Sequence, residues 1–228
     1  MLAAAGTALW AWLTTSGSKS SVCFGSAVQG LLSDARRLPA QGANFRASSL
    51  LLWHSGRMSM HGSVREVVAA AYADVASSRP ELRFVYGEAS WPHGGRFPPH
   101  KTHRNGISVD FMMPVRDADA KVSEIPTSLA NHFGYEVRFD AAGRSGRLII
   151  DFDAMAVHLA ALNKAASRSG IAIKVVVLDL ELQPALRASF ARAAPGVIVP
   201  LSTSRPSSRH DNHYHIDFDV PCRPLPEK

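Results

Sequence analysis

The strongest constraint on the fold comes from two short stretches, about a hundred residues apart, in which apolar and polar residues alternate. The first stretch has apolar residues on one face and polar residues on the other: Ile107, Val109 and Phe111 against Ser108 and Asp110. The second has the same arrangement: Tyr214, Ile216 and Phe218 against His213, His215 and Asp217. A period of two is typical of a β-strand, whose successive side chains point to opposite faces. We therefore expect two strands that each carry polar, ligand-type side chains on one face.

The polar faces of these strands predict a metal site. Asp110 is flanked by apolar residues, where a carboxylate is costly unless it is paired or bound to a cation. His103 lies at the end of a Gly- and Pro-rich loop that leads into the first strand, and His213 and His215 point into the same space. Zinc binds histidine nitrogen and aspartate oxygen. We predict a three-ligand zinc site formed by His103, Asp110 and His215, with water in the open fourth position that marks a catalytic centre.

Length and charge limit the class of protein. The 228 residues are enough for one domain with a substantial core. The net charge is +6, but lysine and arginine are scattered, with no run longer than the pair at residues 36–37. No nucleic-acid-binding motif accompanies them, so we expect no nucleic-acid partner. The composition favours an exported protein with a weak attraction for an anionic polymer.

The first residues are interpreted as a signal peptide. Residues 2–13 form an apolar run that is too short to span a bilayer, and small and polar residues follow up to residue 21. No lysine or arginine precedes the run, which leaves an ordinary terminal helix as the alternative. We predict a signal peptide over residues 1–21, a single domain with the zinc site over residues 22–228, and no stable membrane span after removal of the signal.

The chain contains two cysteines, one at each end of the predicted domain. An even number of cysteines in an exported chain suggests a disulfide, here between Cys23 and Cys222. The alternative is a pair of unrelated free thiols.

Periodicity and capping signals predict three helices, over residues 62–78, 152–169 and 184–193. Ser63 and Glu66 match a capping box at the start of the first helix, and Asp151 is expected to cap the second. Strands are expected at residues 82–86, 107–112, 171–178 and 212–220, with 171–178 in the centre of the sheet, and weaker strand signals lie at 50–53, 135–139, 148–150 and 197–201. This order predicts an α+β domain with a mainly antiparallel sheet that carries the site, and helices packed on one side.

Three other parts of the chain receive simpler interpretations. Residues 24–60 are expected to form a long wrapped segment, and residues 115–146 a substrate-facing insertion. Glu88 could contact the site, although a solvated loop acid is the simpler interpretation. The remaining histidines that we considered, His54, His61 and His158, are interpreted as surface or packing residues.

The motifs, taken in order, resemble the penicillin-insensitive murein endopeptidase family of the lysostaphin, D-Ala-D-Ala metallopeptidase and Hedgehog-like group. The resemblance covers most of the chain after Cys23 and is carried by residues 23–25, 42–45, 94–97, 100, 103, 106–110, 205–206, 210 and 213–215. The sequence departs from the family pattern at Glu88, where aspartate is expected, and has fewer cysteines than the enterobacterial enzyme.

The resemblance implies a periplasmic zinc peptidase that cuts D-Ala to diaminopimelate cross-links of peptidoglycan. It implies one Zn²⁺ per chain on His103, Asp110 and His215, with His213 as the main catalytic histidine and His100 and His210 as its neighbours. No glutamate is placed as in a HExxH protease, so histidine is the expected acid and base for attack by a zinc-bound water. We expect His213 to orient or deprotonate the water.

Two alternatives remain open at this stage. The first is a D,D-carboxypeptidase or dipeptidase of the same zinc group, which an acidic base near the zinc would favour; none is in motif position. The second is a non-catalytic zinc domain that binds the cell wall, which the presence of His213 argues against. The sequence does not decide whether D,D or L,D cross-links are cut, or whether the protein forms oligomers.

Overall fold

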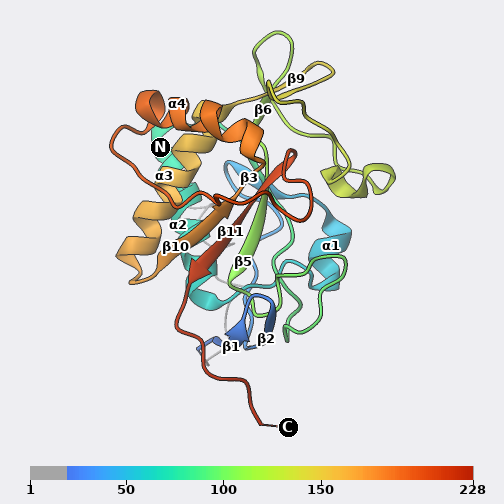
Figure 1. The fold of residues 1–228 in the computed structure, drawn as a ribbon, viewed down its shortest axis with the longest axis vertical. Coiled ribbons are helices and arrows are strands. Elements are labelled where there is room, and N and C mark those ends of the chain that lie inside the picture. The colour runs from blue at the N-terminus through green and yellow to red at the C-terminus, as the bar shows by residue number, and fades with distance from the viewer. Residues whose placement is uncertain (1–19, 228) are drawn as a thin grey trace, which may run out of the picture.

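The computed structural model describes residues 20–227 and is built around a five-stranded sheet (Figure 1). The strands are β3 (Phe45–Ala47), β4 (Phe84–Tyr86), β5 (Ser108–Met112), β10 (Ala172–Val177) and β11 (His213–Asp219), and their order across the sheet is β10–β11–β5–β4–β3. All neighbouring strands run antiparallel except β3 and β4. The predicted α+β class and the mainly antiparallel sheet are confirmed.

The pairing of β5 with β11 brings the two alternating stretches together. In this register His215 lies opposite Asp110, and Tyr214 lies opposite Phe111. Residues that are directly opposite in an antiparallel pair share one face of the sheet. The polar residues therefore meet on one face, and the aromatic residues meet on the other.

Two helices cover the aromatic face, α2 (Gly62–Ser78) and α3 (Phe152–Arg168), and a third, α4 (Gln183–Ala193), lies beside α3. Helix α3 packs against both α2 and α4, as Figure 1 shows. Tyr72 of α2 and His158 of α3 both contact the ring of Phe111. The three predicted helices and the Asp151 cap of α3 are confirmed, whereas the capping box of α2 is wrong: the His61 side chain caps that helix by accepting from Ser63 N.

The segment after β5 forms a small second sheet and an irregular turn. Strands β6 (Val115–Arg116), β7 (Val122–Ser123), β8 (Arg144–Ser145) and β9 (Leu148–Ile150) pair in the order β7–β6–β9–β8. The expected strand at 135–139 is wrong, because a 3-10 helix, η1 (Leu129–Gly134), precedes it and the carbonyls of Tyr135 and Val137 bind the Asn212 side chain. Figure 1 shows the second sheet beyond one end of the main sheet.

Residues 22–60 contain more regular structure than expected. They form the hairpin β1 (Val22–Ser26) and β2 (Gln29–Ser33), then β3, then helix α1 (Leu50–Ser55). The strand expected at 50–53 is wrong: Ser49 caps a helix there by accepting from Leu52 N, and Gly56 ends it with φ 91°. Apolar residues over so few positions do not distinguish a strand from a short helix.

Strand β10 lies at the edge of the five-stranded sheet, so its expected central position is wrong. Its outer side pairs only through an isolated bridge between Val176 and Leu201, which is all that forms of the weak strand expected at 197–201. The apolar residues of β10 are explained by packing against α3, and not by a position between two neighbouring strands. A further 3-10 turn, η2 (Leu180–Leu182), joins β10 to α4.

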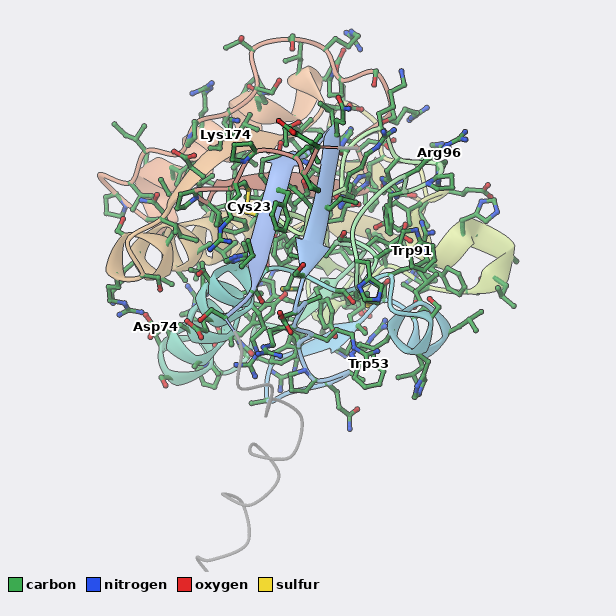
Figure 2. All side chains as sticks on the ribbon, turned by 90° about the horizontal axis from the view of Figure 1, so that it is seen from below. Cys23, Trp53, Asp74, Trp91, Arg96 and Lys174 are labelled. Atoms are coloured by element: carbon green, nitrogen blue, oxygen red, sulfur yellow. A yellow bond between two sulfur atoms is a disulfide. The ribbon has the colours of Figure 1, made fainter. Side chains whose placement is uncertain are left out.

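The predicted disulfide is present. Cys23 and Cys222 are joined across a sequence separation of 199, and Cys23 is marked in Figure 2 on its hairpin strand. The backbone adds two hydrogen bonds beside the disulfide, from Gly25 N to Arg223 O and from Arg223 N to Cys23 O. The start of the described chain is therefore fixed to the segment that follows β11.

Residues 1–19 of the predicted signal peptide lie outside the described part of the chain. Within residues 20–227, no helix combines the length and apolar character needed to cross a membrane. The predicted boundary of the zinc peptidase domain at residue 22 stays a prediction.

Candidate metal centre

The polar face of the sheet gathers five histidines and one aspartate from four parts of the chain. Asp110 comes from β5, and His213 and His215 come from β11. The loop between β4 and β5 supplies His100 and His103, and the loop before β11 supplies His210. The sheet thus fixes three of the six side chains, and loops bring the other three to them.

Three ligand-type atoms form the closest group. His215 Nδ1 lies 3.0 Å from both His103 Nε2 and Asp110 Oδ1, and the latter two atoms lie 3.2 Å apart. The three residues are between 0% and 5% exposed. Ligands about 2.1 Å from one tetrahedral zinc ion lie about 3.4 Å from each other. The spacing of the three atoms is therefore close to that of one face of a zinc tetrahedron.

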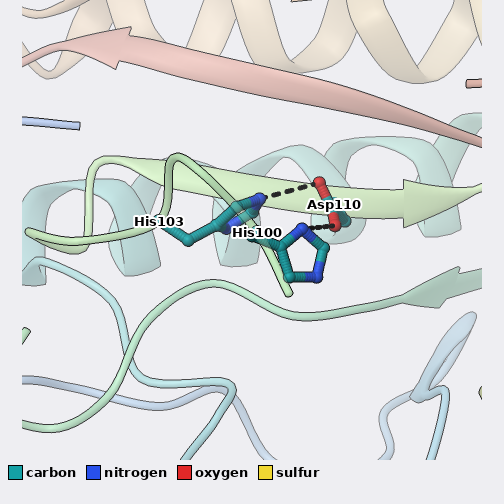
Figure 3. A group of neighbouring side chains, drawn as sticks. All are labelled: His100, His103 and Asp110. Atoms are coloured by element: carbon teal, nitrogen blue, oxygen red, sulfur yellow. Dashed lines mark ion pairs between the residues drawn. The ribbon is translucent and has the colours of Figure 1, made fainter. Parts of the chain in front are cut away.

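A second, overlapping group also has the spacing of a metal site. Figure 3 shows His100, His103 and Asp110, whose ligand-type atoms all lie within 4.8 Å of one another. The longer contact in this group joins His100 Nδ1 to Asp110 Oδ2, at 4.0 Å. Both groups contain His103 and Asp110, and they differ in whether His215 or His100 is the third member.

Hydrogen bonds on the outer side of two histidines leave the inner nitrogens free for a metal. The Nδ1–H of His103 donates to Ala89 O at 2.8 Å, so that Nε2 faces Asp110. The Nε2 of His215 pairs with Asp217 Oδ1 at 2.9 Å, and the Ser108 hydroxyl donates to the same oxygen. Such partners fix the tautomer and the ring orientation of metal ligands.

His213 is held in a similar way, by a neutral partner. Its Nδ1–H donates to Asn212 Oδ1 at 2.6 Å, and its Nε2 lies 3.9 Å from Asp110 Oδ2. Burial lowers the pKa of His213 to about 3, so the imidazole is neutral at pH 7. His210 stacks near it, with ring centroids 4.6 Å apart, and donates its own Nδ1–H to Ser208 O.

Glu88 lies inside the site, which overturns its interpretation as a solvated loop acid. It is 5% exposed, and one carboxylate oxygen lies 2.8 Å from His100 Nε2. The other oxygen is bound by Arg57, which packs over the rings of Trp91 and Phe97. Burial opposes a charge on His100, but the Glu88 hydrogen bond and the negative charges of Asp110 and Glu88 together outweigh it and raise the pKa of the imidazole.

The electrostatics of the central group suit a cation. Burial would raise the pKa of Asp110, but the neighbouring His103 and His213 outweigh it and hold the pKa well below the usual range. Burial lowers the pKa of His103, which is therefore neutral at pH 7. Metal ligands must be deprotonated, so an ionised carboxylate beside a neutral imidazole is a suitable donor set.

The structure adds three residues that the sequence did not predict for the site: Tyr135, Asn212 and Asp217. The Tyr135 hydroxyl donates to Asp110 Oδ2 at 2.9 Å, and the other two hold His213 and His215 as described above. A signal existed for Asp217, which shares the polar face of its strand with His215. Tyr135 comes from the irregular turn after η1, where no periodic pattern marks it.

Of the other histidines, His54 is exposed, as expected. His158 is fully buried in the core, where it pairs with the Tyr214 hydroxyl at 2.6 Å, and it packs against aromatic rings as interpreted from the sequence. His61 is 8% exposed and caps α2. These three residues therefore serve the fold or the surface and are not part of the metal centre.

A mixed α/β fold with a buried His–His–Asp group, ringed by further histidines, has the donor set of a metal-dependent enzyme. A family model of penicillin-insensitive murein endopeptidases matches residues 23–224, and the chain belongs to that family. No curated protein matches the chain. The resemblance stated from the motifs is confirmed over nearly the whole described chain.

Membership of this family makes peptidoglycan the substrate, since murein is the polymer that the family hydrolyses. A cell-wall substrate and a disulfide both imply that the protein is exported.

Proposed function

We propose that the protein is a zinc endopeptidase of the periplasm that cuts D-Ala to diaminopimelate cross-links of peptidoglycan. The observation that carries the proposal is the set of three mutual distances, 3.0, 3.0 and 3.2 Å, among His103 Nε2, Asp110 Oδ1 and His215 Nδ1. One carboxylate oxygen and two imidazole nitrogens are ligands that suit zinc. The donor set therefore fits a single zinc ion per chain.

We assign His215 rather than His100 as the third ligand for two reasons. His215 Nδ1 lies 3.0 Å from the Asp110 oxygen that also faces His103, whereas His100 Nδ1 lies 4.0 Å from the other oxygen. The side chain of His100 is also more exposed, at 17% against 6% for His215. His100 is therefore better placed to contact substrate than to bind the metal.

The remaining histidines surround this group and would carry the acid–base work. A zinc ion bound in the site would activate a water molecule and polarise the scissile carbonyl. His213 would orient or deprotonate the attacking water at Nε2, because Asn212 holds its Nδ1–H and leaves Nε2 open toward the site. His100 and His210 would stabilise charge on the carbonyl oxygen or transfer the proton to the leaving amine.

The test is digestion of purified, cross-linked muropeptide dimers by the protein, with and without a chelator and with penicillin present. We expect conversion to monomers that the chelator abolishes and penicillin does not affect. Release of a terminal D-Ala alone would assign a carboxypeptidase instead. Absence of any product, with zinc bound at one per chain, would assign a non-catalytic binding domain.

A further inference from the structure

We propose that Tyr135 is a positioning residue of the metal site, which directs one oxygen of Asp110 toward the metal by binding the other. This inference rests on the proposed function, because it takes Asp110 as a metal ligand. Tyr135 lies outside the sequence motifs that predicted the metal site. Its role is inferred only from the contacts of its side chain.

The two oxygens of Asp110 have separate partners. Oδ1 lies 3.0 Å from His215 Nδ1 and 3.2 Å from His103 Nε2, whereas Oδ2 accepts from the Tyr135 hydroxyl at 2.9 Å. The carboxylate is 0% exposed, so water does not compete for either oxygen. Each oxygen is therefore assigned to one task.

The direction of the Tyr135 hydrogen bond is fixed by the backbone of a neighbouring strand end. The Glu88 N–H donates to the Tyr135 hydroxyl oxygen at 3.2 Å, and a backbone N–H can only donate. The hydroxyl proton is consequently free to point at Asp110, which as an ionised carboxylate can only accept. Burial of Asp110 makes such a charge-assisted hydrogen bond strong.

The site leaves space for this hydroxyl. A Cβ atom on Gly87 would lie 2.6 Å from the Tyr135 oxygen, a distance at which one of the two groups must move. Glycine at position 87 therefore keeps open the position that the hydroxyl occupies.

The backbone of Tyr135 is hydrogen-bonded to Asn212, the residue that precedes β11. Asn212 Nδ2 donates to Tyr135 O at 2.7 Å and to Val137 O at 2.8 Å, while its Oδ1 accepts from His213. The Tyr135 ring also packs edge-on against His213, with centroids 4.9 Å apart. The insertion after β5 is thus locked to the site at both its backbone and its side chain.

The inference is tested with Tyr135→Phe by measuring the zinc dissociation constant in competition with a chromophoric chelator, and the visible spectrum of the Co²⁺-substituted protein. Loss of a partner that orients a ligand typically weakens metal binding by about 10–100-fold, and we expect a change in this range together with an altered Co²⁺ spectrum. The matched control is Tyr72→Phe, which removes a buried hydroxyl that has no hydrogen-bond partner. Wild-type affinity and spectrum in Tyr135→Phe would overturn the inference.

A second variant tests the same contact without changing the tyrosine. Gly87→Ala should displace the hydroxyl and weaken zinc binding. In a Tyr135→Phe background the contact at 2.6 Å is gone and only the contacts with Asp110 Cβ and Asp110 O, at 3.2 and 3.4 Å, remain, so the added methyl group should weaken binding less than it does in the wild-type protein. Fully additive effects would overturn the inference. If Tyr135→Phe does not fold, Gly87→Ala alone is the test, and wild-type zinc affinity in that variant would overturn the inference.

Asp110→Asn separates this inference from the proposed function. Loss of zinc from Asp110→Asn with unchanged binding in Tyr135→Phe would refute only the role of Tyr135. Zinc binding that survives Asp110→Asn at wild-type affinity would refute the proposed metal site and the inference with it.

Discussion

Each histidine around the metal centre has one ring nitrogen engaged by a protein partner, and the partners differ in charge. His215 pairs with the carboxylate of Asp217, whereas His213 donates to the neutral amide of Asn212. Burial opposes a charge on both rings, but for His215 the hydrogen bonds to Asp110 and Asp217 outweigh burial and raise its pKa to about 10, while burial lowers that of His213 to about 3. The Asp217 carboxylate therefore makes the His215 ring more basic, as a partner of a metal ligand does, whereas the Asn212 amide orients the His213 ring without adding a charge.

The role of His213 leads to the first prediction at this scale. His213→Ala should lower the rate of cross-link hydrolysis by about 10²–10⁴-fold, the usual contribution of a general acid or base, while zinc stays bound at one per chain. The measurement combines muropeptide digestion with metal analysis of the purified protein. His93→Ala, which removes an exposed loop histidine, should change neither quantity. Loss of zinc from His213→Ala would show that His213 is a ligand.

Glu88 provides a second prediction for a single residue. Its hydrogen bond raises the pKa of His100 against the effect of burial, so Glu88→Gln should lower that pKa. If His100 acts in its protonated form, the descending alkaline limb of the pH–rate profile should then move to lower pH, with about 10–100-fold less activity. Glu124→Gln, which removes the partner of Arg46, is the matched control. An unshifted alkaline limb would show that His100 does not work as a charged group.

Among the elements, β5 and β11 were predictable in both extent and orientation, because alternation fixes which side chains share a face. Helices α2, α3 and α4 followed from periodicity and from end signals such as Asp151. The parts that could not be predicted have no period: the turn at Tyr135, and the pairing partners of β10, whose apolar run does not reveal that it lies at an edge. Glu88 was misjudged because burial of a loop residue depends on segments such as Arg57 that are distant in sequence.

The buried contact between His158 of α3 and the Tyr214 hydroxyl of β11 predicts how the free energy of unfolding depends on pH. Burial lowers the pKa of His158 to about 3, so the unfolded chain takes up a proton below about pH 6.5 that the native protein does not bind. The free energy of unfolding should therefore be highest above that pH and fall toward pH 3, and His158 contributes up to about 1.4 kcal/mol per pH unit to this fall.

Urea unfolding of His158→Leu at about pH 7 and pH 4.5 tests this account. The variant should be less stable at neutral pH by about 1–3 kcal/mol, because the buried Tyr214 hydroxyl loses its partner. It should also lose less stability on acidification than the wild-type protein. His54→Leu, at an exposed position, should show the wild-type dependence on pH. An equally steep fall in both His158→Leu and wild type would contradict the account.

For the molecule as a whole, the disulfide was predictable from the number and context of the cysteines, whereas the β1–β2 hairpin that carries one of them was not. The bond closes a loop over a sequence separation of 199 and adds to the backbone pairing between residues 23–25 and 223. We expect the Cys23→Ser/Cys222→Ser protein to lose about 2–5 kcal/mol of unfolding free energy, as is usual for native disulfides in exported proteins.

Chemical denaturation of the double variant, with the oxidised wild-type protein as reference, measures this loss. Cys222 contacts the loop of the site through Asn105 Nδ2, at 3.4 Å, and Asn105 is not one of the proposed ligands, so zinc stoichiometry of the folded double variant should stay at one per chain. Equal stability of the two proteins would show that the backbone pairing alone fixes the two ends.

The position of β11 determines when the protein can become active. It is the last strand along the described chain, yet it lies inside the sheet, with β10 on one side and β5 on the other. His213 and His215 therefore reach Asp110 only when this strand has entered between partners that precede it. A chain that folds progressively from its beginning therefore brings the proposed ligands together only at that moment, and it cannot hydrolyse peptidoglycan before then.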